Sequence, residues 1–138
     1  WLGLDIGEKR IGVALSDETK TLARPLLTLK RASKKEDFAR LGTLCAEHQI
    51  DRIIAGLPKT LRNEEGPQAR RIRRYADELY AVLQLPIEFW DERFSSVDAA
   101  ERLAASSRKV RDKGAIDSAA AAIILQDYLN DQLAMNNC

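Results

Sequence analysis

An acidic residue in the middle of a short apolar strand is the feature that most constrains this chain. The opening residues read LGLDIGEKRIGVAL, which predicts a strand, a polar turn and a second strand that folds back on the first. Because side chains alternate along a strand, the large apolar side chains face one side and Asp5 faces the other, between two glycines. A charge on an apolar strand costs free energy unless it is paired or binds a metal. Asp5 is therefore a candidate metal ligand, and the alternative is a turn carboxylate that bonds nearby backbone amides.

Length and composition predict one globular domain over residues 1–138. The chain is 45% hydrophobic and 31% charged, and its length allows a sizeable core. No apolar run approaches the roughly 20 residues of a membrane span. No signal-peptide pattern opens the chain. Because the chain starts directly on a strand, we expect a few native residues to be missing before Trp1. Cys45 and Cys138 form no metal spacing or disulfide framework, which favours a cytoplasmic protein with no membrane partner.

The distribution of charge indicates a phosphate-bearing partner, although the net charge is only +1. Residues 59–74 carry six basic side chains against two acids, and residues 108–113 carry four against one. Local excesses of this kind can bind nucleic acid, and the alternative is a solvated helix face. The candidate nucleic-acid-binding residues are Lys9, Arg10, Arg62, Arg70, Arg73, Arg108, Lys109, Arg111 and Lys113.

The order of predicted elements is three strands, a helix, a strand, a helix, a strand and further helices. The third strand spans 21–30, and Pro25 inside it indicates a sheet edge because proline cannot donate to a ladder. The first three strands can form an antiparallel meander, and the last two follow helices long enough for right-handed parallel crossovers. We therefore predict an α/β fold with a mixed five-stranded sheet in the order 3-2-1-4-5, an antiparallel second strand and helices on both faces. The later elements are expected as strands at 51–58 and 86–90, helices at 96–105 and 115–133, and a mobile basic loop at 106–114.

Separate acidic residues converge in this topology. The ends of the first, fourth and fifth strands lie on the same side, which brings Asp5 toward the two acids directly after residue 90. Alternation places Glu92 on the opposite face from Asp91. Asp117 lies near the start of the final helix, where four alanines allow close packing on the sheet. Its alternative role is a helix-start carboxylate favoured by the helix dipole.

Carboxylates without histidine or cysteine partners predict the chemistry of hard cations. Such oxygen ligands select Mg²⁺ or Mn²⁺. Two of these ions roughly 4 Å apart can hold a phosphodiester, with one activating water and the other stabilising the leaving oxygen. The single histidine, His48, and the distant cysteines argue against a nucleophile triad, and the chain has no P-loop or dinucleotide fingerprint.

Four motifs resemble those of the YqgF/RuvX family, in the same order and over nearly the whole chain. They are Gly3–Ala14, Gly56–Pro58, Asp91–Ser96 and Lys113–Ala120. The resemblance implies an RNase H-like fold and a bacterial cytoplasmic endonuclease, described as a Holliday junction resolvase and, more strongly, as a nuclease that processes pre-16S rRNA. It implies catalytic, metal-binding acids at Asp5, Glu92 and Asp117, with two Mg²⁺ or Mn²⁺ ions as cofactors.

One departure from the related RuvC resolvases affects the ligand set. Where they have an acid at the fourth strand, this chain has Gly56-Leu57-Pro58, so the second ligand must come from Asp91 or Glu92. We predict Glu92, because it faces the same side as Asp5 and its longer side chain reaches back from the strand end. Asp91 is then predicted to support the site by bonding turn amides or by orienting Arg93.

Three function classes remain open on the sequence alone. The first is a metal-dependent nuclease acting on structured RNA, with DNA four-way junctions as the near alternative, in a monomer or weak homodimer. The second is a small-molecule phosphotransferase, since the actin, Hsp70 and sugar-kinase superfamily also opens with an acidic glycine hairpin. That superfamily needs two lobes to enclose ATP, and this chain has room for one. The third is a nucleic-acid-binding protein without catalysis, and retention of all three acids weighs against it.

Overall fold

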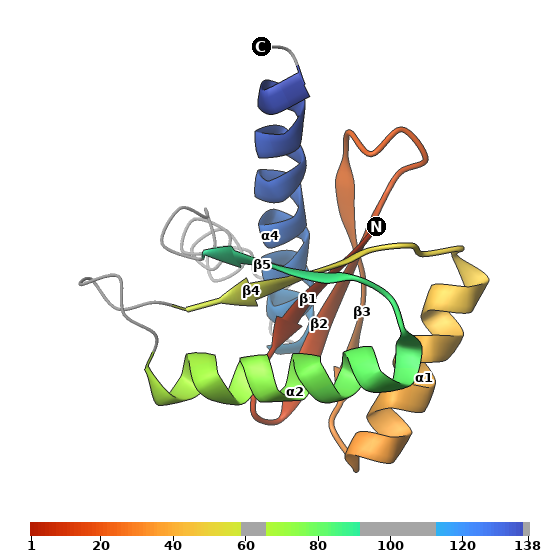
Figure 1. Cartoon of the computed structure of the whole chain (residues 1–138), viewed down its shortest axis with the longest axis vertical. Coiled ribbons are helices and arrows are strands. Elements are labelled where there is room, and N and C mark those ends of the chain that lie inside the picture. Colours follow the sequence, from red (N-terminus) through yellow and green to blue (C-terminus); the bar gives the residue numbers. More distant parts are fainter. Residues whose placement is uncertain (59–65, 92–112, 137–138) are drawn as a thin grey trace.

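A mixed sheet of five strands, in the order β3-β2-β1-β4-β5, organises the chain. The computed structural model describes residues 1–58, 66–91 and 113–136, so the predicted helix at 96–105 and most of the predicted basic loop lie outside the described residues. The elements are β1 (Leu2–Ile6), β2 (Arg10–Ser16), β3 (Ala23–Lys30), α1 (Lys34–Glu47), β4 (Ile53–Leu57), α2 (Pro67–Leu83), β5 (Ile87–Asp91) and α4 (Lys113–Asn136) (Figure 1).

The strand directions confirm the predicted topology. β1 pairs antiparallel with β2 and parallel with β4, β2 pairs antiparallel with β3, and β5 runs parallel to β4. Pro25 lies in β3, at the edge of the sheet, as its missing N–H requires. The register of β2 and β3 shifts between Val13 and Ala14, where Val13 faces Leu27 and Ala14 faces Pro25. One extra residue of β3 therefore bulges out of the ladder beside the proline.

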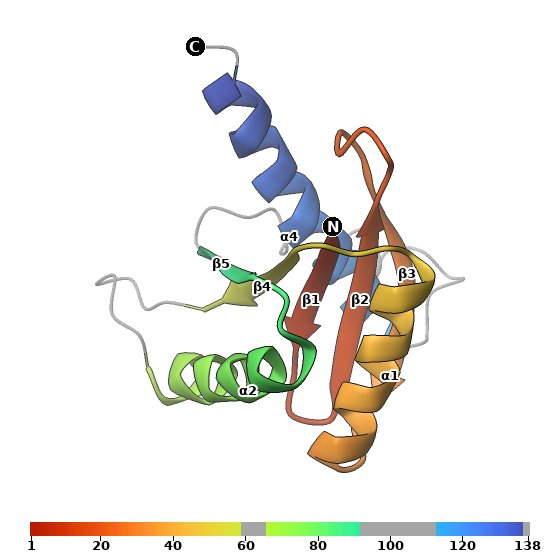
Figure 2. The same ribbon diagram turned by 45° about the vertical axis from the view of Figure 1, so that its right-hand side comes forward.

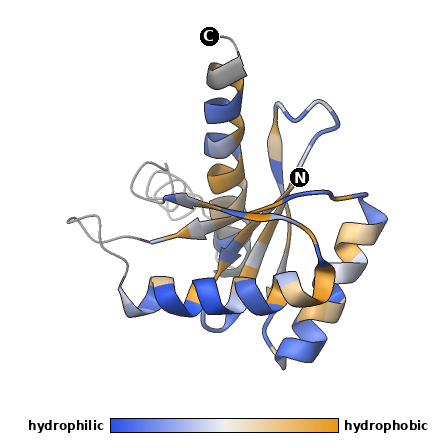
Figure 3. Cartoon of the chain, viewed as in Figure 1, coloured by the Kyte–Doolittle hydropathy of each residue, from blue (hydrophilic) through white to orange (hydrophobic). Residues whose placement is uncertain are grey.

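The two faces of the sheet bury different kinds of side chain. On one face the large residues of β1, which are Leu2, Leu4 and Ile6, join a core with the inner sides of α1 and α2. On the other face, α4 is the helix that packs among those described, through small residues such as Ala121 and through Leu125. Figure 2 shows α1 and α2 in front of the sheet and α4 behind it. Helices cover both faces, as predicted, and Figure 3 shows apolar colours on the strands and on parts of α1 and α4.

Local signals explain where the helices begin and end. Ser33 caps α1, and its Oγ accepts a hydrogen bond of 3.1 Å from the backbone N–H of Glu36. Proline occupies the first turn of α2, where its missing N–H costs nothing, and Gln84 ends this helix in the left-handed conformation with φ 58°. α4 runs from Lys113 to Asn136, so the predicted bounds of 115 and 133 were wrong. Gly114, which was expected in a loop, is the second residue of this helix. No helix among the described residues has the length and apolar character that crossing a bilayer requires.

Side chains near the middle of α4 attach it to the two edge strands of the sheet, β3 and β5. The side-chain amide of Gln126 accepts from the N–H of Ala23, at 2.8 Å, and donates to the carbonyl oxygen of Thr21, at 2.9 Å. The Tyr128 hydroxyl contacts the Glu88 carboxylate of β5 and accepts from Arg52, at 3.1 Å. Burial and the Glu88 carboxylate raise the pKa of Tyr128 to about 12, so the hydroxyl keeps its proton at neutral pH.

The three described helices begin at one edge of the sheet, where β1 ends. β3 runs parallel to β1, since both are antiparallel to β2, and α1 follows its end. α2 follows the parallel strand β4. α4 places Asp117 against β2 opposite Asp5 and Tyr128 against Trp1, so it runs antiparallel to β1. Helix starts carry partial positive charge, and ligands of open α/β sheets bind at the carboxyl ends of the strands.

Candidate functional site

A glycine on the neighbouring strand brings Asp5 and Asp117 together. Asp5 lies opposite Gly12 in the β1–β2 pair, and opposed residues project from the same face with Cβ atoms about 5 Å apart. A Cβ built on Gly12 would lie 2.0 Å from the carbonyl oxygen of Asp117. The backbone of α4 at Asp117 therefore occupies the space beside Asp5. The two acids share the α4 face of the sheet, as predicted, and the room next to Asp5 is filled by the helix.

Neither acid lies at the position that its alternative role assumes. Asp5 lies inside β1 rather than in the turn, which begins after Ile6. Asp117 is the fifth residue of α4, and the first turn of this helix contains no acidic residue. A favourable interaction with the helix dipole falls off within the first turn, so it does not explain this position.

Arg10 makes an ion pair with Asp117. The Arg10 Nε donates to Oδ2 of Asp117 at 2.8 Å, and the two side chains are 35% and 26% exposed. Both residues line a cavity of about 300 Å³ with the β1–β2 turn, whose residues there are Gly7, Glu8 and Lys9. The carboxylate is thus held toward an open, charged space. This space is wide enough for a phosphate group and ordered water.

Side chains at the end of β5 alternate between the two faces of the sheet. Phe89 packs on the core shared with α1 and α2, whereas Trp90 packs on the core under α4. Because consecutive side chains alternate, Asp91, the last residue of β5, lies on the Phe89 face, away from Asp5. The next residue in an extended chain would return to the Asp5 face. Glu92 and Arg93 themselves lie outside the described residues, so their predicted roles stay predictions.

Only two of the three predicted metal ligands, Asp5 and Asp117, lie among the described residues. Asp5 and Asp117 offer oxygen ligands without nitrogen or sulfur, which fits a hard cation such as Mg²⁺ or Mn²⁺. Within 1–58, 66–91 and 113–136, no group of three His, Cys, Asp or Glu residues could hold a metal ion together. The fit therefore requires at least one further oxygen ligand, for which the sequence offers Glu92. Arg10 already neutralises Asp117, and a bound cation would compete with that guanidinium.

The predicted nucleic-acid-binding residues fall into separate groups. Lys9 and Arg10 line the cavity beside Asp117. Arg70 is exposed on α2, but the guanidinium of Arg73 lies 4.7 Å from the ring centre of Phe89, over β5. Lys113 is the first residue of α4, one turn before Asp117. The other candidates, which are Arg62, Arg108, Lys109 and Arg111, lie outside the described residues.

Sequence reasoning missed the most direct contact of the site and a second group of cations. Arg10 and Asp117 are 107 residues apart, and no local pattern pairs them. Arg31 and Lys34 were not among the candidates, although they flank the cap of α1 and lie on the same edge as the end of β1. The only available signal was topological, because the end of β3 shares that edge once the strand order is known.

Comparisons with known proteins identify close relatives along nearly the full chain. Residues 1–131 match a family model described as RuvX, Holliday junction resolvase. A protein of Chloroflexus aggregans named "Putative pre-16S rRNA nuclease" is 47% identical over 132 residues, covering 94% of this chain and 92% of the relative. A protein of the same name from Thermoanaerobacter pseudethanolicus is 41% identical, covering 95% and 96%.

Two solved structures share the fold at low sequence identity. RuvC of T. thermophilus in complex with a Holliday junction substrate aligns with a TM-score of 0.60 at 16% identity, covering 96% of this chain and 94% of that one. The Fowlpox virus resolvase in complex with Holliday junction DNA aligns with a TM-score of 0.55 at 12% identity, covering 96% and 97%. The fold is therefore RNase H-like, as predicted.

Proposed function

The chain belongs to the RuvX family, and on that premise we propose that it is a divalent-metal-dependent endonuclease that cleaves structured RNA. The observation that supports the proposal most directly is the meeting of Asp5 and Asp117 at the carboxyl end of β1. A phosphodiester resists hydrolysis, and a cluster of carboxylates in a basic surrounding is the arrangement that metal-assisted cleavage needs. The relatives named as pre-16S rRNA nucleases favour pre-16S rRNA, near its 5′ end, as the substrate. Such a substrate implies action in the cytoplasm.

Each candidate residue has a defined part in this proposal. Asp5 and Asp117 provide oxygen ligands from a strand and a helix, and Glu92 provides a third from the segment after β5. Asp91 would support that segment from the other face of the sheet, by bonding turn amides or by orienting Arg93. Mg²⁺ or Mn²⁺ bound by these oxygens would supply an activated water and charge stabilisation for the leaving oxygen.

Arg10 orients Asp117 and neutralises its charge before the substrate arrives. Its Nε contacts the carboxylate directly, and the side chain remains one-third exposed. In the complex with substrate the guanidinium can turn to a phosphate oxygen, which it binds in the same planar geometry as a carboxylate. Lys9, exposed on the same turn, would contact the phosphates on either side.

The second candidate function is cleavage of four-way DNA junctions. The specific observation that favours it is the shared fold with two resolvases solved on junction DNA. Because identity to both is below 20%, these structures support the alternative through the fold alone, and the family model that matches residues 1–131 is also described as a Holliday junction resolvase. A nucleic-acid-binding protein without catalysis remains the interpretation that a negative cleavage result would favour.

A cleavage assay with matched carboxylate variants tests the proposal. Pre-rRNA fragments and four-way junctions are offered with Mg²⁺, with Mn²⁺ and with EDTA. Asp5→Asn should abolish cleavage because it keeps the shape and removes the ligand charge, whereas Asp51→Asn, at an exposed residue before β4, should leave cleavage unchanged. Full activity of Asp5→Asn, or cleavage that persists in EDTA, would refute the metal-dependent mechanism.

A second pair of variants tests which acid after β5 binds metal. Glu92→Gln should lose both cleavage and metal binding in a calorimetric titration. Asp91→Asn should bind metal and lose activity only in part, because Asp91 lies on the opposite face from Asp5. The reverse pattern would assign the ligand to Asp91.

A further inference from the structure

A basic cavity lies on the far side of the β1–β2 turn from the Asp5–Asp117 site. Its volume is about 250 Å³, and it is enclosed by the turn, the segment from β3 into α1, and the first half of α2. We call it the Arg31 cavity. Its lining contains four cations and one anion, which are Arg31, Lys34, Arg71, Arg74 and Glu8. A solvated helix face would carry its charges on one element, whereas these four cations come from two parts of the chain, the segment from β3 into α1 and the first half of α2, which line one space.

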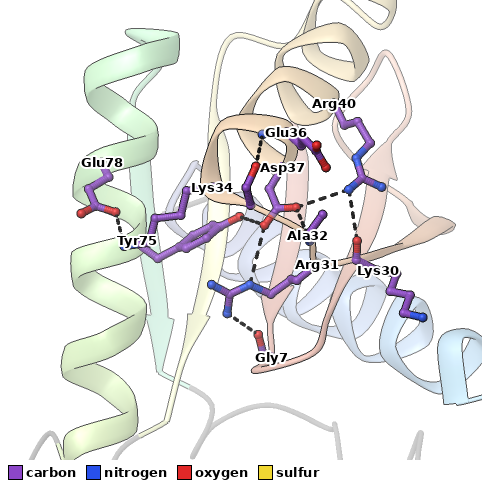
Figure 4. A network of polar contacts seen from close by, with 11 residues as sticks. Gly7, Lys30, Arg31, Ala32, Lys34, Glu36, Asp37, Arg40, Tyr75 and Glu78 are labelled. Carbon is purple, nitrogen blue, oxygen red and sulfur yellow. Dashed lines mark hydrogen bonds and ion pairs between the residues drawn. The ribbon is translucent and has the colours of Figure 1, made fainter.

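Arg31 is fixed at the base of this cavity by contacts on several sides. Its Nη1 donates to the carbonyl oxygen of Gly7 at 2.8 Å, and its guanidinium lies 4.7 Å from the ring centre of Tyr75. Its Nε lies 3.8 Å from the carboxylate of Asp37, which is only 1% exposed (Figure 4). That carboxylate also accepts from the N–H of Ala32 and the hydroxyl of Tyr75. A guanidinium held in this way loses little conformational entropy when it binds an oxyanion.

Two of the other cations, Arg71 and Lys34, make ion pairs between partly exposed side chains, which an incoming anion can replace. Arg71 lies 3.7 Å from Glu8, with side chains 64% and 77% exposed. Lys34 lies 2.6 Å from Glu78, and both are nearly half exposed. Ion pairs between partly exposed side chains contribute little to stability, so exchanging the carboxylate for a phosphate costs little. Arg74 is also exposed at the cavity wall.

The start of α2 adds to the positive potential of the cavity. Its cap residue, Gly66, makes no side-chain hydrogen bond to the helix, and the first turn contains no acidic residue. Gln68 of that turn lines the cavity. Backbone N–H groups at a helix start favour an anion, in support of the four side chains.

The position of the Arg31 cavity relates it to the candidate active site. Gly7 and Glu8 line both the Arg31 cavity and the cavity that contains Asp117 and Arg10. We propose that the Arg31 cavity binds a backbone phosphate of the same nucleic-acid strand whose scissile phosphate lies at Asp5 and Asp117. This inference rests on the proposed nucleic-acid substrate and adds a second contact, across the turn, that fixes the path of the strand.

The chemistry of the cavity selects a phosphate rather than a stacked base. Tyr75 is its only aromatic residue among those described, and its side chain is 3% exposed beneath Arg31. No ring face is therefore available for a base. Contacts to phosphate carry no sequence information, so the cavity is expected to position the substrate without reading its sequence.

Binding without catalysis tests the proposal. A single-stranded RNA with a 5′-hydroxyl end and a 3′ fluorophore is titrated with the full chain in EDTA, and anisotropy is followed at several salt concentrations. The double variant Lys34→Gln/Arg74→Gln should weaken binding at least tenfold. It should also reduce the slope of log affinity against log salt by up to about 1.4, for two lost contacts to a single strand. Lys35→Gln/Arg24→Gln, at exposed residues that do not line the cavity, removes the same charge and should change affinity less than twofold.

Each result distinguishes the possible explanations. Equal weakening by both double variants would overturn the inference, because it would reflect overall charge alone. If the double variant weakens binding only of a 5′-phosphorylated RNA, the cavity binds a terminal phosphate. If inorganic phosphate at millimolar concentration competes with the RNA, the cavity binds free phosphate. Either result would overturn the proposal that it binds a backbone phosphate. A wild-type chain that binds no RNA or junction DNA would refute the proposed function itself. Asp5→Asn should bind RNA normally while failing to cleave it, which separates the two proposals.

Discussion

Substitution of Gly12 by alanine should damage the active site with little change elsewhere. The new Cβ would lie 2.0 Å from the carbonyl oxygen of Asp117 and 2.3 Å from its carbonyl carbon. Cβ atoms essentially never approach other heavy atoms closer than 3.0 Å, so β2 and the start of α4 must separate by about 1 Å. The atoms in contact are backbone, which cannot turn aside as a flexible side chain can. Asp117 therefore moves away from Asp5.

The magnitude of this effect follows from the displacement. Overpacking of a well-packed interface costs about 1–3 kcal/mol, which for a chain of this size lowers the melting temperature by roughly 4–12 °C. A misplacement of about 1 Å in a catalytic group can reduce the rate about 100-fold. We expect Gly12→Ala to remain folded at 25 °C and to lose about two orders of magnitude in cleavage rate.

Two other glycines provide matched controls. Gly3→Ala also meets α4, at 2.8 Å from the Cβ of Leu125, but more than one helical turn beyond Asp117. It should lower the melting temperature with a smaller loss of cleavage. Gly42→Ala, inside α1, meets only the end of the Leu83 side chain at 3.0 Å and gains helix propensity, so it should be neutral or slightly stabilising.

Thermal denaturation and single-turnover cleavage of the three variants decide the question. If Gly12→Ala matches the wild type in both measurements, α4 does not rest on Gly12 and the assembly of the site is wrong. If Gly3→Ala and Gly12→Ala lose activity equally at the same folded fraction, general destabilisation explains the loss.

Three further predictions concern stability and charge. Asp37→Ala should lower the free energy of unfolding by about 3 kcal/mol in urea, because it leaves Arg31 and the buried Tyr75 hydroxyl without their carboxylate, and Asp37→Asn should cost less. Burial raises the pKa of the Cys45 thiol from 9.0 to about 11, so folding favours the protonated thiol. The contribution of this thiol to the free energy of unfolding is complete below pH 9 and is lost as the pH rises toward 11. Denaturation at pH 8 and pH 10.5 should detect the loss, and Cys45→Ala should diminish the difference between the two pH values. A double-mutant cycle with Arg10→Gln and Asp117→Asn should give a coupling of about 1 kcal/mol, because both side chains are partly exposed. A coupling near zero would indicate that the ion pair is not maintained in solution.

The fold was predictable because its local patterns agree with its topology. Alternation in β1 separated Asp5 from its large neighbours, and Pro25 marked the edge strand. In α2 the helical spacing of Ile72, Tyr75, Ala76 and Leu79 places them on one side of the helix, and all four are buried. These features depend on residues within one or two turns of each other, which a single sequence contains.

The site was only partly predictable, because its contacts are long-range. The convergence of Asp5 and Asp117 followed from strand order, but the pairing of Asp117 with Arg10 depends on how closely α4 approaches β2. The start of α4 at Lys113 was missed because a glycine and a run of charges resemble a loop, and packing on the sheet outweighs that local preference. The cations around Arg31 come from α1 and α2, and no periodicity links the two helices.

The absence of side chains at Gly3 and Gly12 connects stability with function. Gly12 lies against the backbone of α4 at Asp117, and Gly3 lies against Ala121 and Leu125. The large buried side chains of this interface, which are Ile54, Ile124, Leu125, Tyr128 and Leu129, lie elsewhere in it. Large side chains at the two glycines would add hydrophobic stabilisation but would push the helix, and Asp117 with it, away from Asp5. The hydrogen bonds of Gln126 and Tyr128 compensate by fixing the helix further along. Stability on this face therefore comes from anchors two turns or more beyond Asp117, and the close approach at Gly12 is left to position the carboxylate.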